Sequence, residues 1–148
     1  MRIRDKVKKP QRPVVAYEIL PPREKDGTLN SYAEIISSLL SQTHIDAINI
    51  PEVLDENGRG DRPVENYKRG EPREFGRLLQ DIVGVEAIIN RVVVHESFET
   101  QLRWIEETNK IYEIENMIIV GGESSKVEYP GPSVNDVLKK VSREYNQN

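Results

Sequence analysis

Four glutamates lie in or just after short apolar runs of this sequence, where a charged side chain is unusual. They are Glu18, Glu52, Glu96 and Glu123. An unpaired carboxylate inside an apolar strand is costly, so Glu18, within residues 14–20, must be paired, protonated or used chemically. Burial raises the pKa of such a carboxyl group, which suits a general acid. We therefore predict either a proton donor at Glu18 or a buried ion pair in which Arg91 is the partner.

The same carboxylates permit a second kind of chemistry. Carboxylate oxygens and imidazole nitrogens can ligate a divalent metal. The residues that would supply these ligands are Glu18, Glu52, His95 and Glu123. This alternative predicts a metal-assisted barrel enzyme of the aldolase or isomerase type, whose activity a chelator would remove.

Further residues at the ends of the apolar runs fit the wall of a ligand site. Gly121 and Gly122 follow the fourth run, and glycines there allow close approach by a planar or phosphorylated ligand. Asn49, Asn90 and His95 lie in or near the ends of the second and third runs and could line the same site. The chain has neither a Gly-x-Gly-x-x-Gly motif nor a P-loop, so the glycines alone are a weak signal.

Bringing these side chains to one site requires a repeated strand–helix framework. Four β-branched apolar runs predict strands near residues 14–20, 46–50, 87–94 and 117–120. Apolar residues at helical spacing predict helices near residues 29–40, 75–82, 98–112 and 134–141. Near-continuous apolar strands are typical of parallel sheets buried on both faces. The order fits an open doubly wound sheet or half of a (β/α)8 barrel, and both place ligands at the carboxyl ends of the strands.

Local signals predict where three of these helices begin. Pro72 suits the first turn of the second helix, and Ser97 suits the N-cap of the third. Ser133 and Asp136 form a capping-box pattern at the start of the fourth.

Composition excludes several classes of function. The chain has 148 residues, a formal net charge of -4 and no cysteine. The lack of cysteine rules out disulfides, iron–sulfur clusters, cysteine-bound zinc and thiol catalysis. No apolar run approaches the roughly 20 residues of a membrane-spanning helix. Because no apolar export signal is present either, we expect a cytoplasmic protein without a membrane partner.

Charge is unevenly distributed along the chain. Residues 1–12 carry six basic residues and one acidic residue, whereas the remaining 136 carry 15 basic and 24 acidic residues. A basic arm can bind nucleic acid, but a solvated terminus is the simpler interpretation, and an acidic body disfavours a broad phosphate-binding surface. We predict a basic arm at residues 1–13, one domain at residues 14–148 and no nucleic-acid partner.

Two segments resemble one enzyme family. Residues 17–23 read Tyr-Glu-Ile-Leu-Pro-Pro-Arg, which resembles the first-strand signature of the methylenetetrahydrofolate reductase family, aromatic-Glu-Phe-Phe-Pro-Pro-Lys/Arg. Residues 115–123 resemble that family's apolar strand ending in Arg-Gly-Asp, and the strand–helix rhythm fits over most of residues 14–145. The resemblance implies an α/β fold of four βα units, the first half of a (β/α)8 TIM barrel. Such a half-barrel would be completed by self-association or by a partner chain.

The resemblance also implies an activity, the reduction of methylenetetrahydrofolate to methyltetrahydrofolate. Glu18 matches the family's acid, which protonates a folate nitrogen so that the five-membered ring opens to an iminium, and a hydride then reduces this iminium. Glu123 falls where the family has an aspartate that contacts the pterin and lies near the flavin. The implied ligands are a reduced folate and either FAD or NAD(P)H, in a cofactor site lined by Glu123, Gly121, Gly122, Asn49, Asn90 and His95. A non-catalytic half-barrel subunit of a larger complex stays open as a further alternative.

Overall fold

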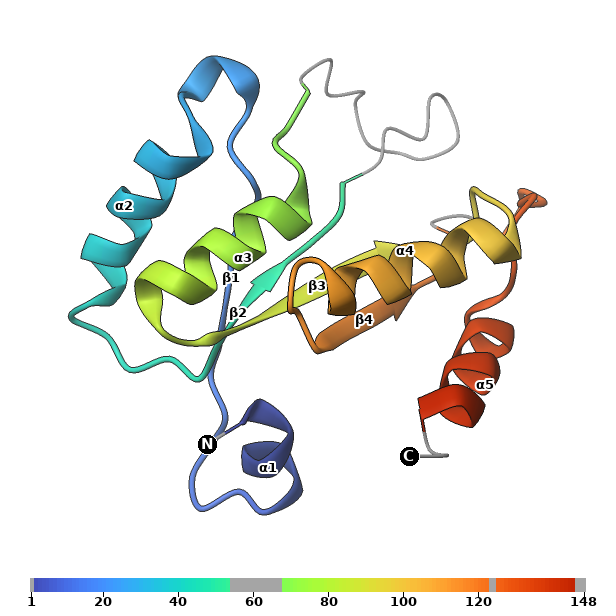
Figure 1. Ribbon diagram of the computed structural model, residues 1–148, viewed down its shortest axis with the longest axis horizontal. Helices are drawn as coiled ribbons and strands as arrows, with labels where there is room; N and C mark the ends of the chain where they lie inside the picture. The colour runs from blue at the N-terminus through green and yellow to red at the C-terminus, as the bar shows by residue number, and fades with distance from the viewer. Residues whose placement is uncertain (1, 54–67, 123–124, 146–148) are drawn as a thin grey trace.

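The protein is built around one sheet of four parallel strands with helices between them (Figure 1). The computed structural model describes residues 2–53, 68–122 and 125–145. The strands are β1 (Ala16–Glu18), β2 (Ala47–Ile50), β3 (Glu86–Val92) and β4 (Asn116–Val120). The helices are α1 (Ile3–Lys8), a short 3-10 helix (Glu24–Asp26), α2 (Leu29–Leu40), α3 (Pro72–Val83), α4 (Phe98–Lys110) and α5 (Val134–Tyr145). The predicted alternation of strands and helices from residue 14 onward is confirmed.

The helix starts follow the local signals in the sequence. Pro72 is the first residue of α3, where its missing N–H removes no helical hydrogen bond. Ser97 caps α4 by accepting a hydrogen bond from the Thr100 amide. The Ser133 hydroxyl likewise accepts from the Asp136 amide at 3.2 Å, which confirms the N-cap half of the predicted capping box, and it donates to the Asp136 carboxylate at 2.7 Å.

Strand order distinguishes the two architectures that the sequence left open. The four strands lie in the order β1-β2-β3-β4, and every neighbouring pair is parallel. A doubly wound sheet reverses its strand order at a switch point, and this sheet shows no reversal among the described strands. In Figure 1, α3 and α4 lie in front of the sheet. The arrangement is an α/β fold consistent with half of a barrel.

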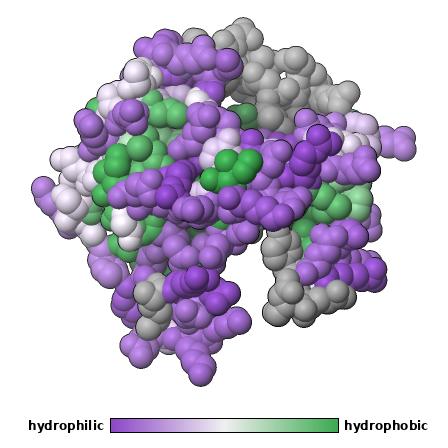
Figure 2. Space-filling view, viewed as in Figure 1, coloured by the Kyte–Doolittle hydropathy of each residue, from purple (hydrophilic) through white to green (hydrophobic). Residues whose placement is uncertain are grey.

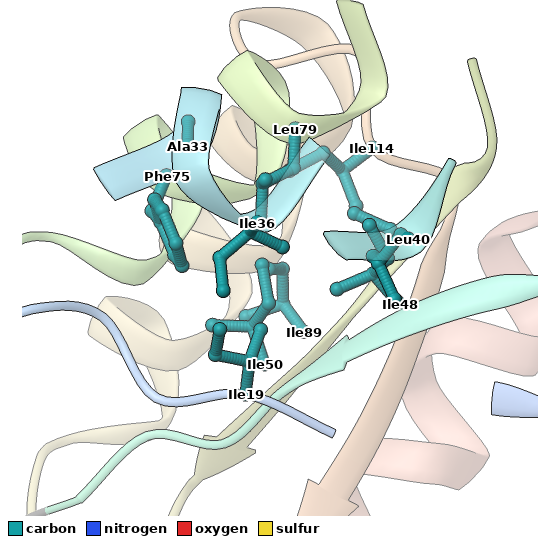
Figure 3. Packing of buried hydrophobic residues seen from close by; sticks show 11 residues of the cluster. Ile19, Ala33, Ile36, Leu40, Ile48, Ile50, Phe75, Leu79, Ile89 and Ile114 are labelled. Carbon is teal, nitrogen blue, oxygen red and sulfur yellow. The ribbon is translucent and has the colours of Figure 1, made fainter. Parts of the chain in front are cut away.

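The core lies between the sheet and the helices. Side chains on one face of β2 and β3 pack beneath α2 and α3, as the close view in Figure 3 shows. Gly76 lets α3 approach this face closely, because a Cβ there would lie 2.9 Å from the Ile89 Cδ1 atom. A second, smaller cluster joins the carboxyl end of β3 to α4 and α5. It consists of Val93, Val94, Ile105 and Val137.

The opposite face of the sheet, here called the inner face, is partly exposed. The strand register places Glu18, Asn49, Ile88, Asn90 and Ile118 on it. All three residues of β1 are exposed, and Ile118 keeps 45% of its surface accessible. The prediction that the strands are buried on both faces is therefore wrong for β1 and for Ile118 of β4. In a closed barrel this face would be the interior.

The basic N-terminal segment is attached to the amino ends of the strands, although most of its residues are exposed. Ile3 is buried in α1, and its amide donates to the Glu86 carboxylate at the start of β3. Two of the segment's cations, Lys6 and Arg12, bind Asp46 at distances of 2.8 to 3.0 Å, just before β2. α1 thus lies beneath the amino ends of the strands, where the contacts of Ile3, Lys6 and Arg12 hold the segment.

The outer surface of α2 and α3 carries apolar side chains, which gather at the left of Figure 2. Ile35, Leu39 and Ile82 are 57%, 63% and 39% exposed there. Within the described ranges, no helix has both the length and the apolar character needed to cross a membrane.

Candidate functional site

The carboxyl end of the inner face brings together three of the predicted site residues. Glu18 ends β1 and is the direct neighbour of Asn49 in β2. The Asn49 Nδ2 group donates a hydrogen bond of 2.8 Å to the Glu18 Oε2 atom. Asn90 lies on β3, two residues beyond Ile88, which is the register partner of Asn49. Glu18 and Asn49 are therefore direct neighbours, Asn49 and Asn90 are diagonal neighbours, and the three residues form a row across three strands.

Glu18 differs from the sequence expectation in its surroundings. It is exposed at the edge of the sheet, not enclosed in an apolar wall, because no strand or helix of the described chain covers the inner face. It does not pair with Arg91, whose side chain belongs to the helix-covered face. Its one described hydrogen bond from a side chain comes from Asn49.

Two acceptor atoms of this row have no partner. The Oδ1 atoms of Asn49 and Asn90 are both buried, and neither accepts a hydrogen bond from the described part of the chain. A buried acceptor without a donor is destabilising by about 1–3 kcal/mol. Such atoms are therefore notable in a folded chain.

Arg91 occupies the centre of a separate network on the other face of β3. Its guanidinium donates to Glu52 at 2.6 Å and to Gln101 at 2.8 Å, and it also binds the Glu96 carboxylate. The second oxygen of Glu52 accepts from the Val92 amide at 2.9 Å. Glu52 and Glu96 are therefore tied to an arginine on the helix-covered face, and their described hydrogen bonds are not made with Glu18.

The same network includes the single tryptophan of the chain. The Arg91 guanidinium lies 4.7 Å from the centre of the Trp104 ring, and the Arg73 guanidinium lies at the same distance from that ring. A guanidinium over an indole face is attracted by the ring's negative quadrupole. This cluster joins β3 to α3 and α4 and so holds these three elements together.

The glycines after β4 support an aromatic contact within the chain. A Cβ on Gly122 would overlap the ring of Tyr129, whereas one on Gly121 would meet only the Val134 side chain at 3.5 Å. Tyr129 also lies edge-on to His95, with ring centres 5.4 Å apart. The Tyr129 ring thus occupies the space that the missing side chain of Gly122 leaves. Sequence reasoning missed Tyr129, although the Pro-Gly-Pro turn after it was a signal that the chain folds back here.

One predicted site residue cannot be placed in this geometry. Glu123 lies outside the described residues, so its relation to Glu18 stays a prediction. Among the residues that are described, no group of three or more histidine or acidic side chains is arranged to hold a metal ion. Glu52, which the metal hypothesis uses, is already bound by Arg91.

The fit of a dinucleotide cofactor can be judged from the charges on the inner face. The described strand residues that share this face include two acids, Glu18 and Glu86, and none of them is basic. Phosphate groups bind where backbone amides or cations converge. The described strand residues of this face therefore supply no cation for the phosphates of FAD or NAD(P)H.

Comparison with known proteins does not assign the chain to a family. No family model matches the chain, and no curated protein matches its sequence. The functional assignment therefore depends on the residues and geometry described above.

Proposed function

We propose that this chain supplies the first four βα units of a barrel enzyme that reduces methylenetetrahydrofolate to methyltetrahydrofolate. The observation that carries the proposal is the position of Glu18. Its carboxylate lies on the inner face at the carboxyl end of β1, where barrel enzymes hold their catalytic groups, and Asn49 orients it. The resemblance of residues 17–23 to the family's first strand supports the same assignment.

In this proposal Glu18 acts as the general acid. Its proton passes to a folate nitrogen, the C–N bond of the five-membered ring breaks, and an iminium carbon is left on the substrate. NAD(P)H would supply the hydride that reduces this carbon to a methyl group, either directly or through FAD that NAD(P)H has first reduced. The role of Asn49 is to hold the Glu18 carboxyl group in position while the proton moves.

Because Glu18 is exposed in this chain, the proposed reaction needs a second half of the barrel to cover it. A proton donor works best where water is excluded, because charge stabilisation is strongest in a dry site. The inner face becomes dry when a second copy or a partner chain covers it. We therefore include self-association, or a partner that completes the barrel, in the proposal.

Turnover of methylenetetrahydrofolate tests the assignment, with FAD and NAD(P)H both supplied. We expect Glu18→Gln to lower turnover by about 100-fold or more while folate binding persists, since general acids contribute 10²–10⁴-fold. The matched control is Glu34→Gln, which removes an exposed carboxylate from α2 and should change neither quantity. Undiminished turnover in Glu18→Gln would contradict the proposal.

The open inner face favours one alternative, a non-catalytic half-barrel subunit of a larger complex. Exposed β1 and the exposed Ile118 side chain both fit a surface that a partner covers. The two candidates differ in folate binding. A stable complex that binds no reduced folate would favour the subunit.

A further inference from the structure

We infer that a second copy of this chain completes the barrel, and that α5 of each copy packs against α2 of the other copy. The inference rests on the half-barrel of the proposed function, and it names the partner that this function requires. Figure 1 shows α2 at one end of the helical layer and α5 at the other end. The argument concerns these two ends, where the sheet and the helical layer both stop.

The two edge strands have complementary free edges. In the described sheet β1 and β4 each pair with one neighbour, and all the strands are parallel. A copy rotated by half a turn about the barrel axis brings its β4 beside β1 and its β1 beside β4. Both new pairs are parallel, and together they make the eight strands of a closed barrel. Two copies therefore leave no free edge, whereas a contact of this kind that did not close would continue into a filament.

The flank of α2 that faces away from α3 is apolar. Asn30 lines the groove between α2 and α3. Successive residues of a helix are about 100° apart, so Leu39 lies about 180° round the helix from Asn30, and Ile35 about 140°. Leu39 and Ile35 keep 63% and 57% of their surface exposed. These side chains therefore offer a contact surface on the far side of α2 from α3.

The flank of α5 that faces away from α4 is also apolar. Val141 and Glu144 line the groove between α4 and α5. Leu138 lies about 120° round the helix from Glu144, and it is 45% exposed. Leu138 is therefore on the side of α5 where the next helix of a closed barrel would lie.

Both flanks are uncharged around their apolar side chains. Residues three and four positions away are neighbours on the surface of a helix. None of these neighbours of Ile35 or Leu138 is charged, although charged residues make up 31% of the chain. The two flanks therefore suit contact with each other better than contact with water or with a charged partner.

The helix-covered face of β1 is exposed beside the same flank. Tyr17 is the register partner of Ile48 and shares its face. Ile48 is fully buried, whereas Tyr17 is 40% exposed and Val15 is 43% exposed. Helices form a ring outside the strands of a closed barrel. The helix that follows β4 of the second copy is its α5, which would cover this side of β1.

Exposed apolar side chains are concentrated where the second copy would lie. Eleven large hydrophobic residues of the described chain are exposed, and six of them lie on the edge strands or on the two flanks. They are Val15, Tyr17, Ile35, Leu39, Ile118 and Leu138. Apolar surface that is concentrated in this way marks an interaction site. The matching apolar surface is one that the chain itself presents, so the partner is a second copy.

The absence of cysteine from the chain makes cross-linking a direct test. Ile35 lies six residues after the first residue of α2, and Leu138 lies four residues after the first residue of α5. Both helices begin at the carboxyl ends of strands, so at 1.5 Å per residue these side chains differ in height by about 3 Å. A short bismaleimide can therefore join them across the contact between α2 and α5.

The experiment mixes Ile35→Cys chains with Leu138→Cys chains before the bismaleimide is added. We expect a covalent dimer, at least about tenfold more abundant than in the control, because contact raises the effective concentration of the two thiols. Neither variant alone should form it, since the two-fold axis keeps like residues apart. The matched control mixes Ile111→Cys with Leu138→Cys, because Ile111 is 67% exposed at the end of α4, on neither flank.

Two further measurements keep the test decisive. Leu39→Cys replaces Ile35→Cys if thermal unfolding shows that the latter variant is not folded. The native mass of the unmodified chain should correspond to two copies. A monomer at every concentration, an assembly of more than two copies, a cross-link within either single variant, or equal cross-linking in the control would overturn the inference.

Turnover of methylenetetrahydrofolate by the unmodified chain separates this inference from the proposed function. If turnover depends on Glu18 but the specific cross-link does not form, the inference alone is overturned, and another chain completes the barrel. If the specific cross-link forms and no folate is bound or reduced, the contact between α5 and α2 is confirmed and the proposed function is overturned.

Discussion

At the scale of single residues, Asp46 is the most heavily bonded carboxylate at the amino end of the sheet. Its oxygens accept from Arg12, Lys6 and the Val15 amide, and these bonds hold the pKa of Asp46 well below its usual 3.8. A carboxyl group whose pKa is lowered by folding stabilises the fold above its unfolded pKa. That stabilisation is lost as the pH falls below about 4.

Asp46→Asn should therefore lower the midpoint of thermal unfolding at pH 7, and the difference from the unmodified chain should shrink steadily below about pH 4. The control is Asp26→Asn. Arg23 lowers the pKa of Asp26 too, but Asp26 is exposed, so its ion pair contributes little and the expected change is small. A difference at pH 7 that stays constant down to pH 3 would contradict this account.

Gly122 provides a second residue-scale prediction. Gly122→Ala should displace the Tyr129 ring and destabilise the fold by about 1–3 kcal/mol, the usual cost of overpacking. The His95 ring protons should shift in an NMR spectrum as the edge-on contact changes. Gly121→Ala is the matched control, because its Cβ would make only an ordinary contact with Val134. Equal effects of the two substitutions would contradict the packing account.

At the scale of elements, periodicity and caps were sufficient to predict most of the fold. The expected helix at residues 29–40 is α2. α4 begins directly after Ser97, as the preference of serine for the N-cap predicts. These features are local, so the sequence shows them directly. The helix at residues 3–8 was missed, because six residues give little periodicity and its stability comes from contacts with Asp46 and Glu86.

The partners of charged residues were harder to predict than the elements. The sequence shows that Arg91 lies in a strand, but not that it faces the helices and binds Glu52 and Glu96. That choice depends on the strand register and on which sheet face the helices cover. Exposure of Glu18 has the same origin, since a strand sequence does not reveal that the second face stays open.

The Arg91 network predicts a large effect of one substitution. Arg91→Met should destabilise the fold by roughly 3–5 kcal/mol, because Glu52, only 11% exposed, would lose the cation that neutralises it. Adding Glu52→Gln should recover part of this loss. Fluorescence of Trp104 during urea unfolding measures both, since the Arg91 guanidinium lies over that ring.

Arg77→Met is the control for the network, because Arg77 also contacts two carboxylates but on the surface. Its side chain is 39% exposed, and its partners are Asp81 and Glu113. The expected loss is at most about 1 kcal/mol. A loss as large as that of Arg91→Met would show that burial is not the cause.

At the scale of the whole molecule, the sheet of the described residues has two free edges and a partly exposed inner face. In the described chain β1 and β4 each pair with one neighbour only, so their outer N–H and C=O groups have no strand beside them. Parallel strands are normally covered on both faces. A second copy placed edge to edge would set β1 beside β4 of its partner, in parallel, and would enclose both inner faces.

The proposed self-association predicts a measurable effect of Ile118, which is 45% exposed on the inner face. Ile118→Lys should shift the chain from a larger species toward a monomer in analytical ultracentrifugation, because a buried lysine would lack a partner in the enclosed interior. Ile111→Lys is the matched control: Ile111 is 67% exposed at the end of α4, away from this face, and should leave the distribution unchanged. If the unmodified chain sediments as a monomer at every concentration, a second copy does not cover the face. Equal shifts in the two variants would show that added charge alone, and not the inner face, controls association.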